Sequence, residues 1–196
     1  MTSDDLTTPA EVSPHTAPSA EVDGSGRIFA RPVELAVMVA IVVADQLTKA
    51  LVSATLPLGD SYSVIPGWLE FTHVQNTGAA FGFLNNVDFP YKTLVMLALA
   101  AAALAALALY AMQLGLHEKL ARLGMAVVLG GAIGNAVGRA AVGHVVDFVD
   151  VRWDGIHFWA FNLADAALWV GAFLVILDLS GVGRARVQPL VSDYSE

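Results

Sequence analysis

Four long apolar segments constrain the fold more than any other feature of this sequence. They cover about residues 33–56, 91–112, 121–142 and 162–180. Each approaches the ~20 residues that an α-helix needs to cross a lipid bilayer. The second is the clearest, because no charged or strongly polar side chain lies between Leu94 and Met112. Hydrophobic residues make up 56% of the chain, more than a soluble core of this size requires. The sequence therefore predicts an all-α membrane protein with four transmembrane helices.

The segment before the first apolar run differs in composition. Residues 1–26 are rich in Pro, Ser, Thr and acidic residues and contain no Lys or Arg, so they carry much of the net charge of −8. They lack the basic and apolar regions of a signal peptide. Because such a segment has little apolar surface to bury, we expect residues 1–30 to form a disordered acidic tail. One membrane domain is expected over residues 31–182, followed by a cytoplasmic tail over 183–196.

Basic residues beside the apolar segments predict how the chain crosses the membrane. Arg27 and Arg31 precede the first segment, Lys119 and Arg122 adjoin the link between the second and third, and Arg184 and Arg186 follow the fourth. By the positive-inside rule these three regions are cytoplasmic. Both termini are therefore expected in the cytoplasm, and the loops 57–90 and 143–161 on the outer face.

Both outer loops carry strand and turn signals. In the first, Pro66-Gly67 separates two runs rich in β-branched and aromatic residues, which predicts a small β element. In the second, Asp154-Gly155 lies between short apolar or aromatic runs, and this dipeptide is typical of a two-residue hairpin turn. We therefore expect β structure beside the helices on the outer side.

Polar side chains inside the apolar segments need a partner or a function, because a charge at the bilayer centre costs roughly 2.5–3.5 kcal/mol on insertion scales. Asp45 and Lys49 are spaced i, i+4 in the first segment, which is also the spacing of a structural ion pair. Asn135 and Arg139 repeat this spacing in the third segment, among glycines that let a neighbouring helix approach closely. These side chains are expected to face the bundle rather than lipid.

Asp147 and Asp165 flank the second outer loop, one after the third segment and one at the start of the fourth. A hairpin between them would bring both carboxyls together at one depth. Such a pair shares a proton, so one member can act as base toward water and the other as acid toward a carbonyl. Either residue alone is also compatible with a helix cap. The chain has no Cys, and His144 and His157 lack a matching ligand set, so no metal is expected.

Several short motifs resemble, in order and spacing, those of one family of membrane enzymes. They read DQLTK, NTGAAFG, GGAIGNAVGR followed by GHVVDF, and FNLAD. Together they resemble the lipoprotein signal peptidases, also called bacterial signal peptidases II, over about residues 33–180. The resemblance implies an aspartyl protease (family A8) of the bacterial inner membrane with a small periplasmic β-cradle. Its activity would be to cleave diacylglyceryl-modified prolipoproteins just before the lipidated cysteine.

The resemblance also implies roles for individual residues and partners. Asp147 and Asp165 match the catalytic pair. Positions that support the pair or contact substrate are matched by Asp45, Lys49, Asn76, Gly78, Asn135, Arg139 and Asn162. Expected partners are diacylglyceryl-prolipoproteins, membrane lipid and inhibitors of the globomycin type. No cofactor, metal or nucleic acid is implied, and a monomer is expected.

The sequence departs from the family pattern at Gly138. The third motif of the family usually reads Gly-Asn-x-x-Asp-Arg, whereas this chain has Gly138 in place of the aspartate before Arg139. A diverged paralogue that is weakly active, or that only binds lipoprotein or signal peptide, therefore stays open. A small ion or proton transporter is a further alternative, although four spans without repeats or broken helices are an unfavourable frame for transport.

Overall fold

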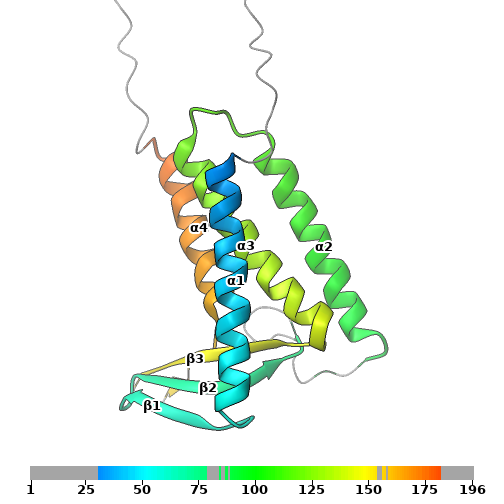
Figure 1. Ribbon diagram of the computed structural model, residues 1–196, viewed down its shortest axis with the longest axis vertical. Coiled ribbons are helices and arrows are strands. Elements are labelled where there is room, and N and C mark those ends of the chain that lie inside the picture. Colours follow the sequence, from blue (N-terminus) through cyan, green and yellow to red (C-terminus); the bar gives the residue numbers. More distant parts are fainter. Residues whose placement is uncertain are drawn as a thin grey trace, which may run out of the picture.

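The computed structural model describes residues 31–78, 84, 87, 89–153, 156, 157 and 159–181. Within these residues four helices run side by side and a sheet lies across one end of the bundle (Figure 1). The elements in chain order are α1 (Pro32–Thr55), β1 (Ser61–Ile65), β2 (Leu69–Asn76), α2 (Lys92–Ala111), α3 (Lys119–Val142), β3 (Val145–Trp153), β4 (Ile156–His157) and α4 (Leu163–Leu179). Each apolar segment of the sequence thus forms one helix, as predicted.

Three of the described helices, α1, α2 and α3, are long and apolar enough to cross a membrane. The fourth, α4, has 17 residues, a number at the lower limit of about 17 for a spanning helix. Large apolar side chains project outward from these helices, among them Leu47 of α1, Leu99 of α2 and Phe173 of α4, each more than half exposed. So much exposed apolar surface is typical of a protein whose helices are solvated by lipid.

Helix α3 lies at the centre of the bundle and packs against each of the other three helices. Glycines bring it closest to α4. A Cβ on Gly124 of α3 would lie 2.7 Å from the carbonyl oxygen of Gly171 on α4, and a Cβ on Gly171 would lie 2.6 Å from the carbonyl oxygen of Gly124. Neither position can hold a side chain without moving the helices apart. The close helix approach predicted from the glycine-rich third segment is confirmed.

A buried ion pair joins α1 to α3 at the end of the bundle opposite the sheet. The Nε and Nη2 atoms of Arg122 donate to the two carboxylate oxygens of Glu34, each at 2.8 Å. Both side chains are buried. Arg122 also donates to the carbonyl oxygen of Leu114 at 3.2 Å, which ties in the link between α2 and α3. Removing one partner of such a pair leaves an uncompensated charge and typically costs about 3–5 kcal/mol.

The sheet is antiparallel with the strand order β1-β2-β3-β4, and α2 and α3 lie in the chain between β2 and β3. Pro66-Gly67 lies in the turn between β1 and β2, where Gly67 has a φ of +79°, so the first predicted hairpin is confirmed. Strand β3 pairs with β4 through Trp153 and Ile156. The predicted Asp154-Gly155 turn itself lies outside the described residues. Because β3 directly follows α3 and α4 begins after β4, the sheet closes the end of the bundle where α4 starts.

Candidate active site

Asp147 lies on β3, opposite Val74 of β2. Its side chain is buried, and an amide faces each of its carboxylate oxygens. The Nδ2 atom of Asn162 donates to Oδ1 at 2.6 Å, and the Nδ2 atom of Asn76 donates to Oδ2 at 3.1 Å. The pairing of β2 with β3 therefore sets the position of Asp147 in the sheet, and the two asparagines orient the plane of its carboxyl group.

Asp165 lies in the first turn of α4, where a helix N-terminus favours a carboxylate. It forms a capping box with Asn162: the backbone N–H of Asp165 donates to Oδ1 of Asn162 at 3.0 Å, and the backbone N–H of Asn162 donates to Oδ2 of Asp165 at 3.2 Å. The Nδ2 atom of Asn135 on α3 donates to the remaining oxygen, Oδ1, at 2.8 Å. Backbone and side-chain donors together fix this second carboxyl group.

Asn162 connects the two aspartates. Its side chain is fully buried. Its Nδ2 atom donates to Asp147 and, at 3.2 Å, to Oδ1 of Asn135, while its Oδ1 atom caps the backbone N–H of Asp165. Both carboxyl groups also line one cavity. The structure therefore brings together the two aspartates that the sequence placed at one depth.

Burial and a like charge perturb the ionisation of Asp147. Burial is the larger effect and the neighbouring Asp165 carboxylate adds to it, and together they raise the pKa of Asp147 to about 6. The amide donors of Asn76 and Asn162 oppose this shift only in part. A carboxyl group that keeps its proton toward neutral pH beside a second carboxyl group is suited to general acid and base chemistry.

Replacing the neighbouring carboxylate should lower the pKa of Asp147. In Asp165→Asn the like charge is gone, so Asp147 ionises more easily and its titration midpoint moves below the value of about 6. Infrared difference spectra between each protein and its Asp147→Asn counterpart isolate the protonated-carboxyl band of Asp147. An unchanged or higher midpoint in Asp165→Asn would show that the two carboxyls do not interact.

Asp45 and Lys49 lie behind the aspartates rather than on the cavity. Their predicted ion pair is present, with 2.7 Å between Lys49 Nζ and Asp45 Oδ2. Oδ1 of Asp45 accepts from the backbone N–H of Ala164, in the first turn of α4, at 3.0 Å. Nζ of Lys49 also donates to Oδ1 of Asn135 at 2.8 Å. Both side chains are buried, so they support the neighbouring elements instead of forming the cavity wall.

Sequence reasoning missed Gln46, which joins α1 to α3 at the same level. Its Nε2 atom donates to Oδ2 of Asp45 at 2.9 Å and to the carbonyl oxygen of Gly134 at 3.0 Å. A Cβ on Gly134 would lie 2.7 Å from Oδ2 of Asp45, so any other residue there would displace the Asp45 carboxylate from its contacts. An amide next to Asp45 in an apolar segment was the available signal, because it too needs a partner.

A series of hydrogen bonds leads from Arg139 through Gly78 and Asn76 to Asp147. The Nη2 atom of Arg139 donates to the carbonyl oxygen of Gly78 at 2.7 Å. The backbone N–H of Gly78 donates to Oδ1 of Asn76 at 3.0 Å. Nδ2 of Asn76 then points to Asp147. Arg139 thus holds the backbone carbonyl of Gly78, two residues after Asn76.

Gly138, where the resemblance predicts an aspartate, lies buried against the start of β3. A Cβ at this position would lie 3.2 Å from the carbonyl oxygen of His144, a tight but adjustable contact. The donors described for Asp147 and Asp165 come from Asn76, Asn135 and Asn162. None of these contacts uses residue 138, so the arrangement around the two aspartates does not depend on a carboxylate there.

We therefore expect Gly138→Asp to leave kcat within about threefold of the parent. The restored carboxylate adds no donor to Asp147 or Asp165, although the tight contact with His144 should lower the melting temperature. Gly138→Ala is the matched control, because it adds the Cβ without the charge. Cleavage rates of a lipidated substrate and melting temperatures of the three proteins test this. Activity found only in the Asp form would identify the natural chain as a diverged, weakly active paralogue.

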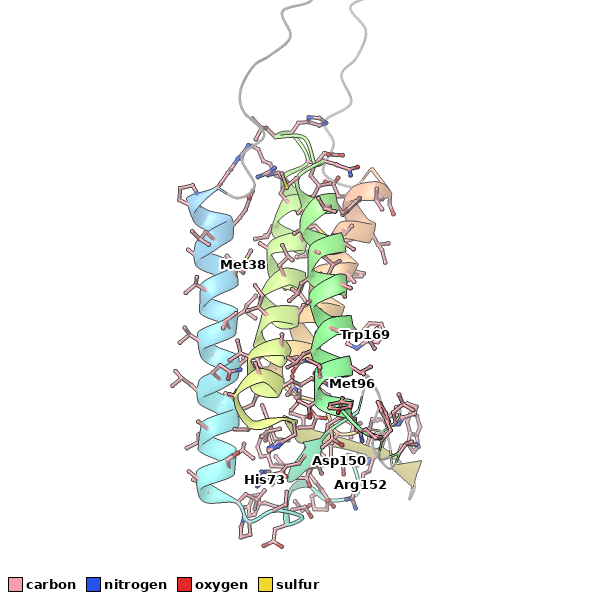
Figure 2. The ribbon with its side chains drawn as sticks, turned by 90° about the vertical axis from the view of Figure 1, so that its right-hand side faces the viewer. Met38, His73, Met96, Asp150, Arg152 and Trp169 are labelled. Atoms are coloured by element: carbon pink, nitrogen blue, oxygen red, sulfur yellow. The ribbon has the colours of Figure 1, made fainter. Side chains whose placement is uncertain are left out.

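A cavity of about 820 Å³ adjoins the two aspartates. Its wall is largely apolar and comes from α2, α3, α4 and the segment after β4, with the polar groups around Asp147 and Asp165 exposed within it. Met96 of α2 and Trp169 of α4 belong to this wall, and Figure 2 shows them on the bundle above the sheet residues Asp150 and Arg152. Its volume suits a large ligand with an apolar body.

The histidines of this region show no grouping that resembles a metal site. Within the described ranges, no three His, Asp or Glu side chains come together as metal ligands would. His73 is buried, and its Nδ1 atom lies 2.8 Å from the carbonyl oxygen of Leu56. His144 lies at the join of α3 and β3, and the side chain of His157 is outside the described residues.

Comparisons with known proteins identify one family of similar sequences. The sequence model of signal peptidase (SPase) II, the peptidase A8 family, matches residues 37–180. The lipoprotein signal peptidase of Geobacter metallireducens is 42% identical over 137 residues, which cover 70% of this chain and 83% of that protein. The lipoprotein signal peptidase of Symbiobacterium thermophilum is 40% identical over 152 residues, covering 76% and 97%.

Solved structures agree with the sequence comparison. A bacterial membrane enzyme solved at 2.3 Å resolution superposes with a TM-score of 0.67 at 30% identity, over 80% of this chain and 93% of that chain. A second, at 1.9 Å resolution, gives a TM-score of 0.66 at 31% identity, over 75% and 92%. Fold and family together define a membrane protease. The chain belongs to the signal peptidase II family.

Proposed function

We propose that this protein is an aspartyl endopeptidase that removes the signal peptide from diacylglyceryl-modified prolipoproteins, cutting before the lipidated cysteine. The observation that carries the proposal is the position of Asp147 and Asp165, held by a shared asparagine where both reach one large apolar cavity. Such a cavity has room for the apolar residues beside the scissile bond and part of the diacylglyceryl group, while the rest of the signal helix and of the acyl chains would lie in lipid. The scissile peptide bond would then lie beside the carboxyl groups.

The mechanism uses one shared proton. The ionised carboxylate takes a proton from water, and the oxygen of that water attacks the carbonyl carbon of the scissile bond. The protonated partner stabilises the developing oxyanion by hydrogen bonding and then passes its proton to the leaving amine. Because the two carboxyl groups interact, the roles of general base and general acid are assigned to Asp147 and Asp165 together and not to one residue each. The reaction requires no metal or cofactor.

The remaining predicted residues have supporting roles in this proposal. Asn76, Asn135 and Asn162 donate to the carboxyl groups and set their planes. Arg139 lines the cavity and, through Gly78, orients Asn76. Asp45 and Lys49 act from behind the cavity, where they join α1 to α4 and to Asn135.

We also propose that all four helices cross the bacterial inner membrane, with both termini cytoplasmic and the sheet on the periplasmic face. Of the described basic residues, Arg31, Lys119 and Arg122 lie at the end opposite the sheet, while Lys92 and Arg152 lie at the sheet end. The greater number at the end opposite the sheet supports this orientation. Residues 31–182 would form the membrane peptidase domain, between the tails 1–30 and 183–196. The protein would act as a monomer, and its substrate would enter the cavity laterally from the bilayer.

Cleavage of a defined precursor tests the function directly. The purified protein in lipid nanodiscs should release the signal peptide from a diacylglyceryl-modified precursor and leave the unmodified precursor uncut. A globomycin-type cyclic peptide should block the reaction by occupying the cavity. Mass spectrometry of both products locates the cut. Failure to cleave the lipidated precursor would refute the proposed function, and cleavage of both precursors at equal rates would refute the assigned substrate.

A further inference from the structure

The amide of Asn135 can occupy its site in two orientations, and only one of them suits Asp165. A half-turn of an asparagine amide exchanges a donor for an acceptor at almost the same position. In the structure Nδ2 of Asn135 donates to Oδ1 of Asp165 at 2.8 Å, and Oδ1 of Asn135 accepts from Nζ of Lys49 at 2.8 Å. The half-turn would aim the amide oxygen at a carboxyl oxygen and the amide nitrogen at an ammonium group.

Lys49 is the main determinant of the orientation of the Asn135 amide. Its contact is a charge-assisted hydrogen bond to an amide oxygen, and such bonds are stronger than neutral ones. The second donor to that oxygen, Nδ2 of Asn162, lies further away at 3.2 Å and makes its shorter contact, 2.6 Å, with Asp147. Lys49 is itself anchored by Asp45 at 2.7 Å.

We infer that Lys49 is a positioning residue of the proposed protease, which rests on the function proposed above: Lys49 fixes the amide of Asn135 so that its donor faces Asp165. Lys49 is buried behind Asn135 and is absent from the described cavity wall, so it acts through the asparagine and not on substrate. The inference predicts that loss of Lys49 impairs the chemical step and leaves substrate binding nearly intact.

A simpler role competes with this one, because Asp45 is fully buried and needs a counter-ion. Lys49→Met would then be harmful only by leaving Asp45 uncompensated. Adding Asp45→Asn separates the two roles. The asparagine retains an oxygen for the backbone N–H of Ala164 but carries no charge, so the double variant has no uncompensated carboxylate.

The test compares the parent, Lys49→Met and the double variant Asp45→Asn with Lys49→Met. We expect Lys49→Met to lower kcat by about 100-fold, as small misplacements of catalytic groups do, with KM changed by less than about threefold. The double variant should regain much of the melting temperature but keep the low kcat. Lys49→Arg, which retains charge and donors, should recover part of kcat. Return of the double variant to parental kcat would overturn the inference.

A second buried ion pair provides the control. Arg122→Met breaks the pair with Glu34 at the opposite end of the bundle, so it should lower the melting temperature and leave kcat unchanged. An equal loss of kcat in Arg122→Met would show that any buried ion pair has this effect and would overturn the inference. If the parent cleaves and Asp147→Asn also cleaves, the proposed dyad fails. If the parent does not cleave, the proposed function fails and the inference with it.

Discussion

Asp147→Asn and Asp165→Asn are each expected to lower the kcat for lipidated precursor by about 10⁴-fold, the scale observed when one member of a proton-transferring unit is replaced. Asparagine has the shape of aspartate but can neither take a proton from water nor give one to the leaving amine. Both side chains already accept hydrogen bonds from amides, so some repacking of those donors is expected. The primary loss should nevertheless be in kcat rather than in folding.

The matched control for these variants is Asp150→Asn. Asp150 is a buried carboxylate on β3, the same strand as Asp147, but it pairs with Arg152 at 3.0 Å and is not among the residues that line the cavity. Its replacement should keep kcat within about threefold of the parent. Single-turnover cleavage in nanodiscs measures all three variants. Processing that persists in both dyad variants, or an equal loss in Asp150→Asn, would refute the assignment of the catalytic pair.

Asn162→Ala should have the second largest effect, because this fully buried side chain donates to the carboxyl group of Asp147 and accepts from the backbone N–H of Asp165. Alanine removes the donor to Asp147 and the cap of α4. Loss of one preorganised donor of this kind typically lowers kcat by about 10²–10³-fold, and loss of the cap costs about 1 kcal/mol of stability. We therefore expect a protein that is both less active and less stable.

Asn162→Ser separates these two contributions. Serine is a good helix cap and can still accept from the backbone N–H of Asp165, but it is too short to reach Asp147 as the asparagine does. The serine variant should therefore melt near the parent and still lose about 10²-fold in kcat. Thermal unfolding in nanodiscs and single-turnover cleavage provide the two measurements. A serine variant with parental kcat would show that Asn162 serves only as a cap.

The sequence predicted the helices and the first hairpin because both depend on local patterns. Length and apolarity determine where α1 to α4 form, and Pro66-Gly67 determines the turn between β1 and β2. The extent of β3 was not predictable in this way. Its nine residues begin directly after α3, and pairing with β2, distant in sequence, sets the register that places Asp147 opposite Val74.

Most side chains that meet at the candidate site were singled out from the sequence, but most of the contacts among them were not. The spacing of Asp45 and Lys49 predicted their ion pair, which the structure contains. That the pair also reaches Asn135 and the backbone of Ala164 depends on how α1, α3 and α4 are rotated and how closely they pack. The glycines of the third segment predict a close approach, but they do not indicate which side chain of a neighbouring helix faces each glycine, such as Asp45 opposite Gly134. The role of Gln46 was missed for the same reason.

The contact of Asp45 with the first turn of α4 links proteolytic competence to the order in which the helices are synthesised. Asp45 is on α1, which is synthesised before the other described helices, and the backbone N–H of Ala164 that donates to it is on α4, the last of them. A nascent chain that ends before α4 lacks Asp165. A chain in which α1 has not yet docked against α4 has both aspartates and the Asn162 cap, but the backbone N–H of Ala164 lacks its acceptor on Asp45. Within the growing membrane protein, the capacity to cut other chains would therefore arise only once α1 and α4 have met.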